Sequence, residues 1–404
     1  MARSSTKSSA LWVLRRLRSA GHQALLAGGC VRDMLLGARS TDYDVATDAT
    51  PQQVRRLFRH VLLVGAKFGV AMVMHKGSKV EVTTFRTDVS YSDGRRPDAV
   101  RFSSPRQDAR RRDFTINGLF YDPVSRQVID YVGGQADLKK RVIRTIGPPE
   151  HRFAEDYLRM IRAARFAVRL DFTIAAATEA AIRQYAPRIS AISGERIFEE
   201  LTKMLSRPTA GRAVAELRRL GLAEAILPEL FWQDGAWEQA ASAATAVAGR
   251  GDVTLTLGAL LGRLAPAEIA RILRRWGASN ELRDGLCWMA ERLDLWPQAA
   301  GLSLADFKRL LANPNFPRLR ALWAFLERQA TGRRTCARRI AGRARSIPPA
   351  KISPRPLLSG HDLKTLGLSE GRELGMVLRA VYEAQLNEQI STRRQALAMA
   401  RQMM

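Results

Sequence analysis

The chain has 404 residues, too many for one ordinary hydrophobic core, so we expect roughly two to four domains. Its 65 Lys and Arg residues outnumber 39 Asp and Glu residues, and the resulting net charge of +26 points to a polyanionic partner. Three widely spaced cysteines argue against a disulfide framework or a zinc site, and no apolar run reaches the roughly 20 residues of a membrane span. We therefore expect a protein of the reducing cytoplasm, without membrane contact.

The first third of the chain alternates helix-like and strand-like patterns. Leucines at helical spacing predict a helix over residues 10–20, although the acid-poor start with Arg and Ser superficially resembles a transit peptide. Short apolar or β-branched runs predict strands, and Thr50 followed by Pro51 predicts the start of a helix. The predicted strands lie at 24–27, 43–46, 70–75 and 80–85, with a helical turn at 31–36.

A turn at residues 76–78 joins the last two of these strands into a hairpin, so residues 24–145 are predicted to form a compact α/β unit. The polar segment 86–102 follows, and it fits either a functional lid or a solvated insertion. From about residue 152 the pattern becomes helical, and strand patterns disappear. Residues 331–356 are basic and proline-bearing, and we interpret them as a linker into a last helical module.

The segment 28–44 combines a glycine pair, an arginine and an Asp-Tyr-Asp sequence. Backbone N–H groups at the glycines, including Gly29, can approach a phosphate closely, and Arg32 adds a guanidinium that matches phosphate geometry. If the segment ends in a strand, Asp42 and Asp44 point the same way and can hold two Mg²⁺ ions for phosphoryl transfer. Asp-x-Asp alone fits a solvated loop better, but its coupling to the glycine motif favours the metal site.

Two further features lie near this motif. Arg112 belongs to a run of three arginines before an apolar segment, which could contact triphosphate oxygens or a ribose edge, with Asp113 and Asn117 orienting them. A solvated basic turn with Asp113 as a helix cap is equally consistent. Glu81, in a strand-like run, could be a third metal-site carboxylate or the exposed side of an edge strand.

The segment 155–166 is predicted to be a helix in which acidic and basic residues share one broad arc, including Arg162 and Arg165. A carboxylate accepts an amino hydrogen and a guanidinium donates to a ring nitrogen, so a fixed Asp156–Arg159 pair would accept ATP and CTP and reject GTP and UTP. The plainer interpretation is an ordinary surface pair on a helix.

In their order and spacing, these segments resemble the class II tRNA nucleotidyltransferase and bacterial poly(A) polymerase family over residues 20–230, and more loosely at the tail. The resemblance implies metal binding at Asp42 and Asp44 and nucleotide contacts at Gly29 and Arg32. Arg111–Asn117 resembles the family's ribonucleotide-selecting motif, and Gly134 with Asp137 resembles its hinge-like motif. Glu155 to Arg165 resembles the base-reading motif, and Glu195 to Leu201 resembles the motif of the neck helices.

The implied fold is α+β, with a polymerase β-like nucleotidyltransferase head on a small mixed sheet followed by helical domains. We expect a head at 1–150, a base-reading helical neck at 151–215, a helical body at 216–335, and a basic linker with a tRNA-binding tail at 336–404. The implied reaction adds CCA, or its terminal A, to tRNA from CTP and ATP with Mg²⁺. The nucleotide contacts would be made by Gly29, Arg32, Arg112, Asp156, Arg159, Arg162 and Arg165.

Three features favour addition of CCA within this family: the loop from 84 to 97, the absence of paired basic residues at 65–68, and the tail segment 360–363. A poly(A) polymerase or an A-adding enzyme remains the near alternative, and a non-catalytic RNA-binding protein is the distant one. The intact carboxylates of Asp42 and Asp44 argue against the distant alternative. No stable protein partner is implied.

Overall fold

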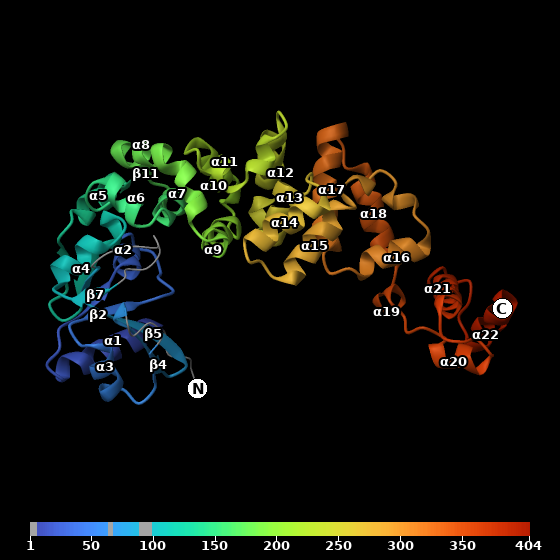
Figure 1. Cartoon of the computed structure of the whole chain (residues 1–404), viewed down its shortest axis with the longest axis horizontal. Helices are drawn as coiled ribbons and strands as arrows, with labels where there is room; N and C mark the ends of the chain where they lie inside the picture. The colour runs from blue at the N-terminus through green and yellow to red at the C-terminus, as the bar shows by residue number, and fades with distance from the viewer. Residues whose placement is uncertain (1–5, 64–67, 89–98) are drawn as a thin grey trace. The chain divides into compact units, whose positions relative to one another are not determined.

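The computed structural model of the chain describes residues 6–63, 68–88 and 99–404. It comprises two compact units (Figure 1). The segment 86–102, which fits either a lid or a solvated insertion, falls partly outside the described residues, because residues 89–98 are not among them, and neither are residues 64–67. The first unit is Met1–Met204 with Thr209–Trp232, and the second is Leu205–Pro208 with Gln233–Met404.

A seven-stranded mixed sheet forms the base of the first unit, which confirms the predicted α+β head. Its strand order is β3-β4-β5-β2-β1-β8-β9, with β2 and β5 parallel and the other neighbours antiparallel. The predicted hairpin is present as β4 and β5. The strands are β1 (Ala24–Ala27), β2 (Asp44–Thr47), β3 (Val61–Leu62), β4 (Val70–His75), β5 (Ser78–Thr84), β8 (Leu119–Asp122) and β9 (Gln127–Asp130).

Helix α1 (Thr6–Ser19) covers part of this sheet with an apolar stripe. Its leucines Leu14 and Leu17 are fully buried, as helical spacing predicts for a domain helix. A buried apolar cluster packs residues of the first strands against later segments. In it, Leu25 of β1 and Ala46 of β2 pack with Phe85 and Phe120. This core fixes the ends of β1 and β2, where the predicted functional motif begins and ends.

Further helices of the first unit connect its strands or follow them in the chain. They are α2 (Gly29–Leu35), α3 (Pro51–Leu57), α4 (Pro105–Arg111), α5 (Gly134–Lys140), α6 (Pro149–Glu155), α7 (Leu158–Leu170), α8 (Ala176–Tyr185), α9 (Gly194–Leu205), α10 (Ala210–Arg219) and α11 (Leu222–Ile226). As predicted, Thr50 caps α3 and Pro51 lies in its first turn. Two further sheets have two strands each: β6 (Arg86–Asp88) pairs with β7 (Val100–Phe102), and β10 (Val142–Ile143) pairs with β11 (Thr173–Ile174). The last pair corrects the prediction that strands end before residue 152.

Close packing explains the glycine of the segment that resembles a hinge motif. A Cβ at Gly134 would overlap the carbonyl oxygen of Thr115, so only glycine allows α5 to approach this turn. Asp137 on the same helix accepts a hydrogen bond from the Thr115 hydroxyl at 2.7 Å and forms an ion pair with Arg144 at 3.1 Å. These contacts attach α5 to the Thr115–Asn117 turn, which borders the site described below.

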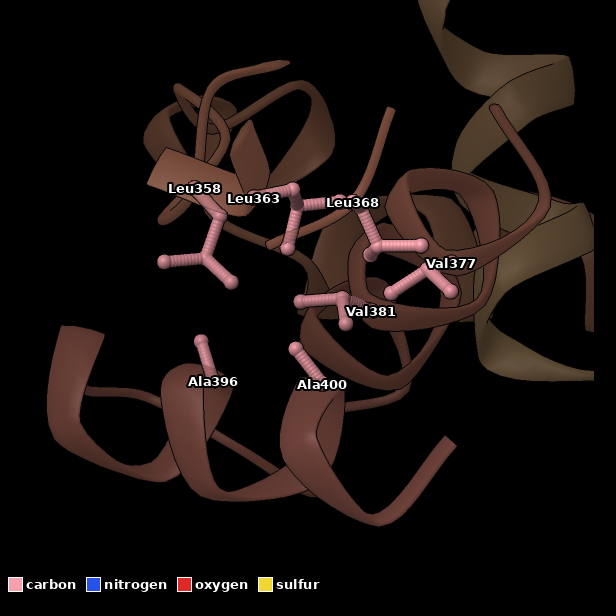
Figure 2. Close-up of a cluster of buried hydrophobic side chains, with 7 residues drawn as sticks. All are labelled: Leu358, Leu363, Leu368, Val377, Val381, Ala396 and Ala400. Atoms are coloured by element: carbon pink, nitrogen blue, oxygen red, sulfur yellow. The ribbon is translucent and has the colours of Figure 1, made fainter. Parts of the chain in front are cut away.

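The second unit is built from helices. They are α12 (Ala236–Val247), α13 (Val253–Leu261), α14 (Pro266–Arg275), α15 (Asn280–Ala290), α16 (Leu304–Ala312), α17 (Phe316–Thr331), α18 (Thr335–Ser346), α19 (Pro349–Ile352), α20 (Gly360–Thr365), α21 (Arg372–Leu386) and α22 (Arg393–Met403). The last three helices enclose a small apolar core (Figure 2). Within the described residues, no helix has both the length and the hydropathy required to cross a membrane.

The predicted linker at 331–356 is wrong in one respect, because residues 335–346 form helix α18. The buried Glu327 carboxylate of α17 accepts hydrogen bonds from the backbone N–H groups of Cys336 and Ala337 at 2.7 and 2.8 Å. A carboxylate at a helix N-terminus satisfies donors that have no partner within the helix. Since Glu327 lies outside the predicted linker, the composition of the linker gave no sign of this cap.

Candidate active site

One cavity of about 590 Å³ in the first unit is bordered by every residue that the sequence analysis assigned to metal or nucleotide binding. These residues come from α2, from the segment 42–44 at the start of β2, from the position that follows α4, and from the helix α7 with the residues before it. They are Gly29, Arg32, Asp42, Asp44, Arg112, Asp156, Arg159, Arg162 and Arg165.

The glycine turn between β1 and α2 brings backbone and guanidinium together. Gly28 has a φ of +72°, which L side chains rarely adopt, and its N–H donates to the carbonyl oxygen of Leu119 at 2.9 Å. A Cβ at this position would lie 2.8 Å from Nη1 of Arg112. Glycine is therefore needed both for the backbone conformation and for the approach of the Arg112 side chain.

Asp42 and Asp44 border the same cavity, although only Asp44 belongs to β2, which begins there rather than at residue 43. The pKa of Asp44 is raised from 3.8 to about 6, chiefly by burial and also by the charges of Glu81 and Asp42, while the charge of Arg112 opposes this shift. A cation stabilises the charged form of a partly buried carboxylate that lies near other carboxylates. The donor set therefore fits a hard divalent ion with oxygen ligands.

Glu81 lies on β5, between β4 and β2, so the suggested edge strand is wrong. Its side chain is exposed and borders a smaller cavity of about 180 Å³ together with Asp44 and Arg112. In the described part of the chain, no cluster of three or more His, Cys, Asp or Glu side chains is placed to hold a metal. Glu81 thus acts through its charge, which raises the pKa of Asp44.

Arg32 is buried at 2% exposure and is held by the protein on all three guanidinium nitrogens. Nε and Nη2 donate to Oδ1 of Asp33 at 2.8 and 2.6 Å, and Nη1 donates to Oδ1 of Asn117 at 2.6 Å. The second oxygen of Asp33 accepts from Arg169 at 3.2 Å. Arg32 therefore contributes a fixed positive charge to the cavity wall.

Asp113 connects the end of α4 to α7 through a buried ion pair. Its Oδ2 accepts from Nε and Nη2 of Arg162 at 2.9 and 2.6 Å, and its Oδ1 accepts from Nδ2 of Asn117 at 3.0 Å. Although burial opposes ionisation, Arg162 and these hydrogen bonds keep the pKa of Asp113 well below its usual range. Because Asp113 is 9% exposed, the alternative of a solvated turn does not apply to it.

Helix α7 directs a row of basic side chains at the cavity. Arg165 donates from Nε to the buried Glu200 carboxylate of α9 at 2.6 Å, and Arg162 lies 3.8 Å from the other oxygen of Glu200. The guanidinium of Arg165 also lies 4.3 Å from the ring centre of Phe166, a distance typical of cation–π contacts. These contacts restrict the arginines to defined positions along one cavity wall.

The predicted continuous helix over 155–166 is wrong, because α6 ends at Glu155 and α7 begins at Leu158. Asp156 lies between them in extended conformation and pairs with Arg196 of α9 at 2.7 Å. Arg159 forms an ion pair with Glu155 and donates to the carbonyl oxygen of Arg152 at 2.7 Å. Both candidate base-reading side chains border the cavity, but each is held by its own partner.

Sequence reasoning missed several residues of the cavity wall. Arg169 continues the helical spacing of Arg162 and Arg165, so a longer helical projection would have included it. Phe166 also borders the cavity, although its aromatic ring at helical spacing fits an ordinary core position. Asp33 follows Arg32 directly, and only the fold shows that this carboxylate faces inward.

The fold and the cavity together define a nucleotidyltransferase. Residues 24–144 match the family model described as the Poly A polymerase head domain, and residues 171–232 match the probable RNA and SrmB-binding site of polymerase A. The CCA-adding enzyme of Bacillus licheniformis is 33% identical over 394 residues, 96% of each chain. The chain therefore belongs to the family of CCA-adding enzymes and bacterial poly(A) polymerases.

Other similarities agree with this assignment. The CCA-adding enzyme of Geobacillus stearothermophilus is 46% identical over 222 residues, but the match spans only about half of each protein, 55% of this chain and 54% of the relative. The crystal structure of the Bacillus stearothermophilus CCA-adding enzyme in complex with CTP superposes with a TM-score of 0.81 at 30% identity, covering 99% of this chain and 98% of that one. The similarity in structure therefore extends over both units.

Proposed function

We propose that this protein adds CMP and AMP to the 3′ end of tRNA to complete the CCA sequence, using CTP and ATP without a nucleic-acid template. The observation that carries this proposal is the single cavity in which two acidic residues at the sheet end face a row of arginines. Similarity to a CCA-adding enzyme over 96% of the chain supports the choice of product.

In the proposed reaction, the RNA 3′ hydroxyl attacks the α-phosphorus of the nucleotide, and pyrophosphate leaves. Asp42 and Asp44 would hold Mg²⁺, which fits their oxygen ligands and the raised pKa of Asp44. When bound, Mg²⁺ supplies Lewis-acid stabilisation of the attacking hydroxyl and the phosphate oxygens. Arg112 and Arg165 supply positive charge for the negative charge of the triphosphate.

Base selection would use the two side chains at the junction of α6 and α7. Asp156 accepts a hydrogen bond from the amino group of adenine or cytosine, and Arg159 donates to the neighbouring ring nitrogen. Guanine and uracil present a carbonyl oxygen beside a ring N–H, which is the reverse pattern. Their carbonyl oxygen would then face the Asp156 carboxylate, and their ring N–H would face the Arg159 guanidinium. The cost of such unpaired polar groups explains rejection of GTP and UTP.

The basic charge of the chain supports binding of tRNA through phosphates and shape. In the second unit, helix α18 carries exposed arginines, among them Arg338 and Arg339. We assign the head, neck, body and tail at the boundaries predicted from the sequence, with the helical parts holding the tRNA. Because tRNA is the substrate, we place this activity in the cytoplasm.

A poly(A) polymerase is the second candidate, because the matching head-domain model carries that description. Labelled CTP and ATP would be supplied with three RNAs: tRNA without CCA, tRNA ending in CC, and an unstructured RNA. CCA synthesis predicts C and A incorporation into the first tRNA and a single A into the second. Long A tails on the unstructured RNA would instead identify a poly(A) polymerase, and undiminished labelling by the Asp44→Ala variant would contradict metal binding at Asp44.

A further inference from the structure

The carboxylate of Asp156 is held on both oxygens by groups of the protein. Its Oδ1 accepts a hydrogen bond at 3.1 Å from the backbone N–H of Leu158, the first residue of α7. Its Oδ2 accepts from Nη2 of Arg196 at 2.7 Å, and the side chains of Asp156 and Arg196 are only 14% and 16% exposed. The orientation of this carboxylate is therefore set by two elements, α7 and α9.

Arg196 itself does not border the cavity, so it has no direct access to a bound nucleotide. Its Nη1 is buried and has no hydrogen-bond partner among the described residues. A buried guanidinium with only part of its hydrogen bonds met costs stability, and its ion pair with Asp156 offsets part of that cost. Its ion pair with Asp156 connects Arg196 to a residue that borders the cavity.

Arg159 is fixed by a separate set of contacts. Glu155 forms its ion pair, and the carbonyl oxygen of Arg152 accepts its hydrogen bond at 2.7 Å. Arg152 in turn donates to the carbonyl oxygen of Arg112, the residue that follows α4, at 2.9 Å. The contacts that hold the two groups therefore differ: Asp156 contacts Leu158 of α7 and Arg196 of α9, whereas Arg159 contacts Glu155 and Arg152 of α6.

We propose that Arg196 is a positioning residue for base selection, which aims the Asp156 carboxylate at the exocyclic amino group of the incoming adenine or cytosine. This inference rests on the proposed function of Asp156. Without Arg196, the carboxylate keeps only the Leu158 contact and can rotate away from the amino group. Removal of Arg196 therefore weakens recognition of the amino group, while Arg159 keeps its contact with the ring nitrogen.

The test compares ATP with purine ribonucleoside triphosphate, which lacks only the amino group, as substrates on tRNA ending in CC. The measured quantity is the ratio of their kcat/KM values for the wild type, Arg196→Met and Arg196→Lys. Arg183→Met is the matched control, because Arg183 forms an ion pair with Glu179 on α8 in the same unit and does not border the cavity. Thermal unfolding of each variant verifies that it is folded.

We expect Arg196→Met to lower the ratio by about tenfold, Arg196→Lys to restore part of it, and Arg183→Met to leave it at the wild-type value. A folded Arg196→Met variant that is slower with both nucleotides but keeps the wild-type ratio would overturn the inference and leave Arg196 a structural role. If the wild type adds AMP but does not prefer ATP, base reading by Asp156 fails, and the inference fails with it. If the wild type adds no nucleotide to any tRNA, the proposed function itself is wrong.

Discussion

Asp44 offers a prediction whose magnitude follows from the structure, namely that Asp44→Asn stabilises the metal-free protein at alkaline pH. The pKa of Asp44 is raised from 3.8 to about 6, so the folded state binds this proton more tightly than the unfolded state does. The free energy of unfolding therefore falls as the pH rises from about 4 to 6, and the penalty is complete above that range. A shift of this size corresponds to about 3 kcal/mol.

Asparagine removes the charge and keeps the shape, so Asp44→Asn removes this penalty. Because Asp44 is only partly buried and loses an attraction to Arg112, we expect a gain of about 1–3 kcal/mol at pH 8, shrinking to less than about 1 kcal/mol at pH 4. For a unit of this size, each kcal/mol raises the unfolding temperature by about 2–4 °C.

The assay is thermal unfolding followed by circular dichroism in the presence of a chelator, at pH 8 and at pH 4. Asp171→Asn is the control for loss of a surface charge, because the Asp171 side chain is 68% exposed. Added Mg²⁺ should stabilise the wild type and not Asp44→Asn, which narrows the difference at pH 8. A variant no more stable than the wild type at pH 8, or equally stabilised at both pH values, would refute the reasoning.

Three further predictions concern selectivity, RNA binding and the glycine turn. Arg159→Ala should reduce discrimination against UTP and GTP by about 1–3 kcal/mol, measured as kcat/KM ratios, and unchanged rejection of UTP would remove Arg159 from base reading. Binding of tRNA should weaken steeply between about 50 and 200 mM salt in a filter-binding assay, and a flat dependence would contradict contact through phosphates. Gly28→Ala should lower the free energy of unfolding by about 1–3 kcal/mol, measured with denaturant, because of the φ of +72° and the approach of Arg112. Gly37→Ala is the control: Gly37 also has a positive φ, but its Cβ would meet no neighbour, so the loss should be smaller.

The sequence determined the local elements of the head and the chemistry of its first motif. The strand at 24–27, the hairpin of β4 and β5, and the proline-initiated helix α3 follow from residue preferences that act over a few positions. The glycine at position 28 and the neighbouring carboxylate motif were also recognisable, because backbone conformation and metal chemistry each require particular residue types. The resemblance to a known family then placed these motifs in one site.

The tertiary structure alone decided which side chains pair within that site. Asp113 meets Arg162 over a separation of 49 residues, and Asp156 meets Arg196 over 40. Such pairs depend on how α7 and α9 pack against the head, and helical periodicity describes only the faces of one helix. The break between α6 and α7 has the same origin: Asp156 in isolation fits a continuous helix, but its contacts with Leu158 and Arg196 hold it in extended conformation.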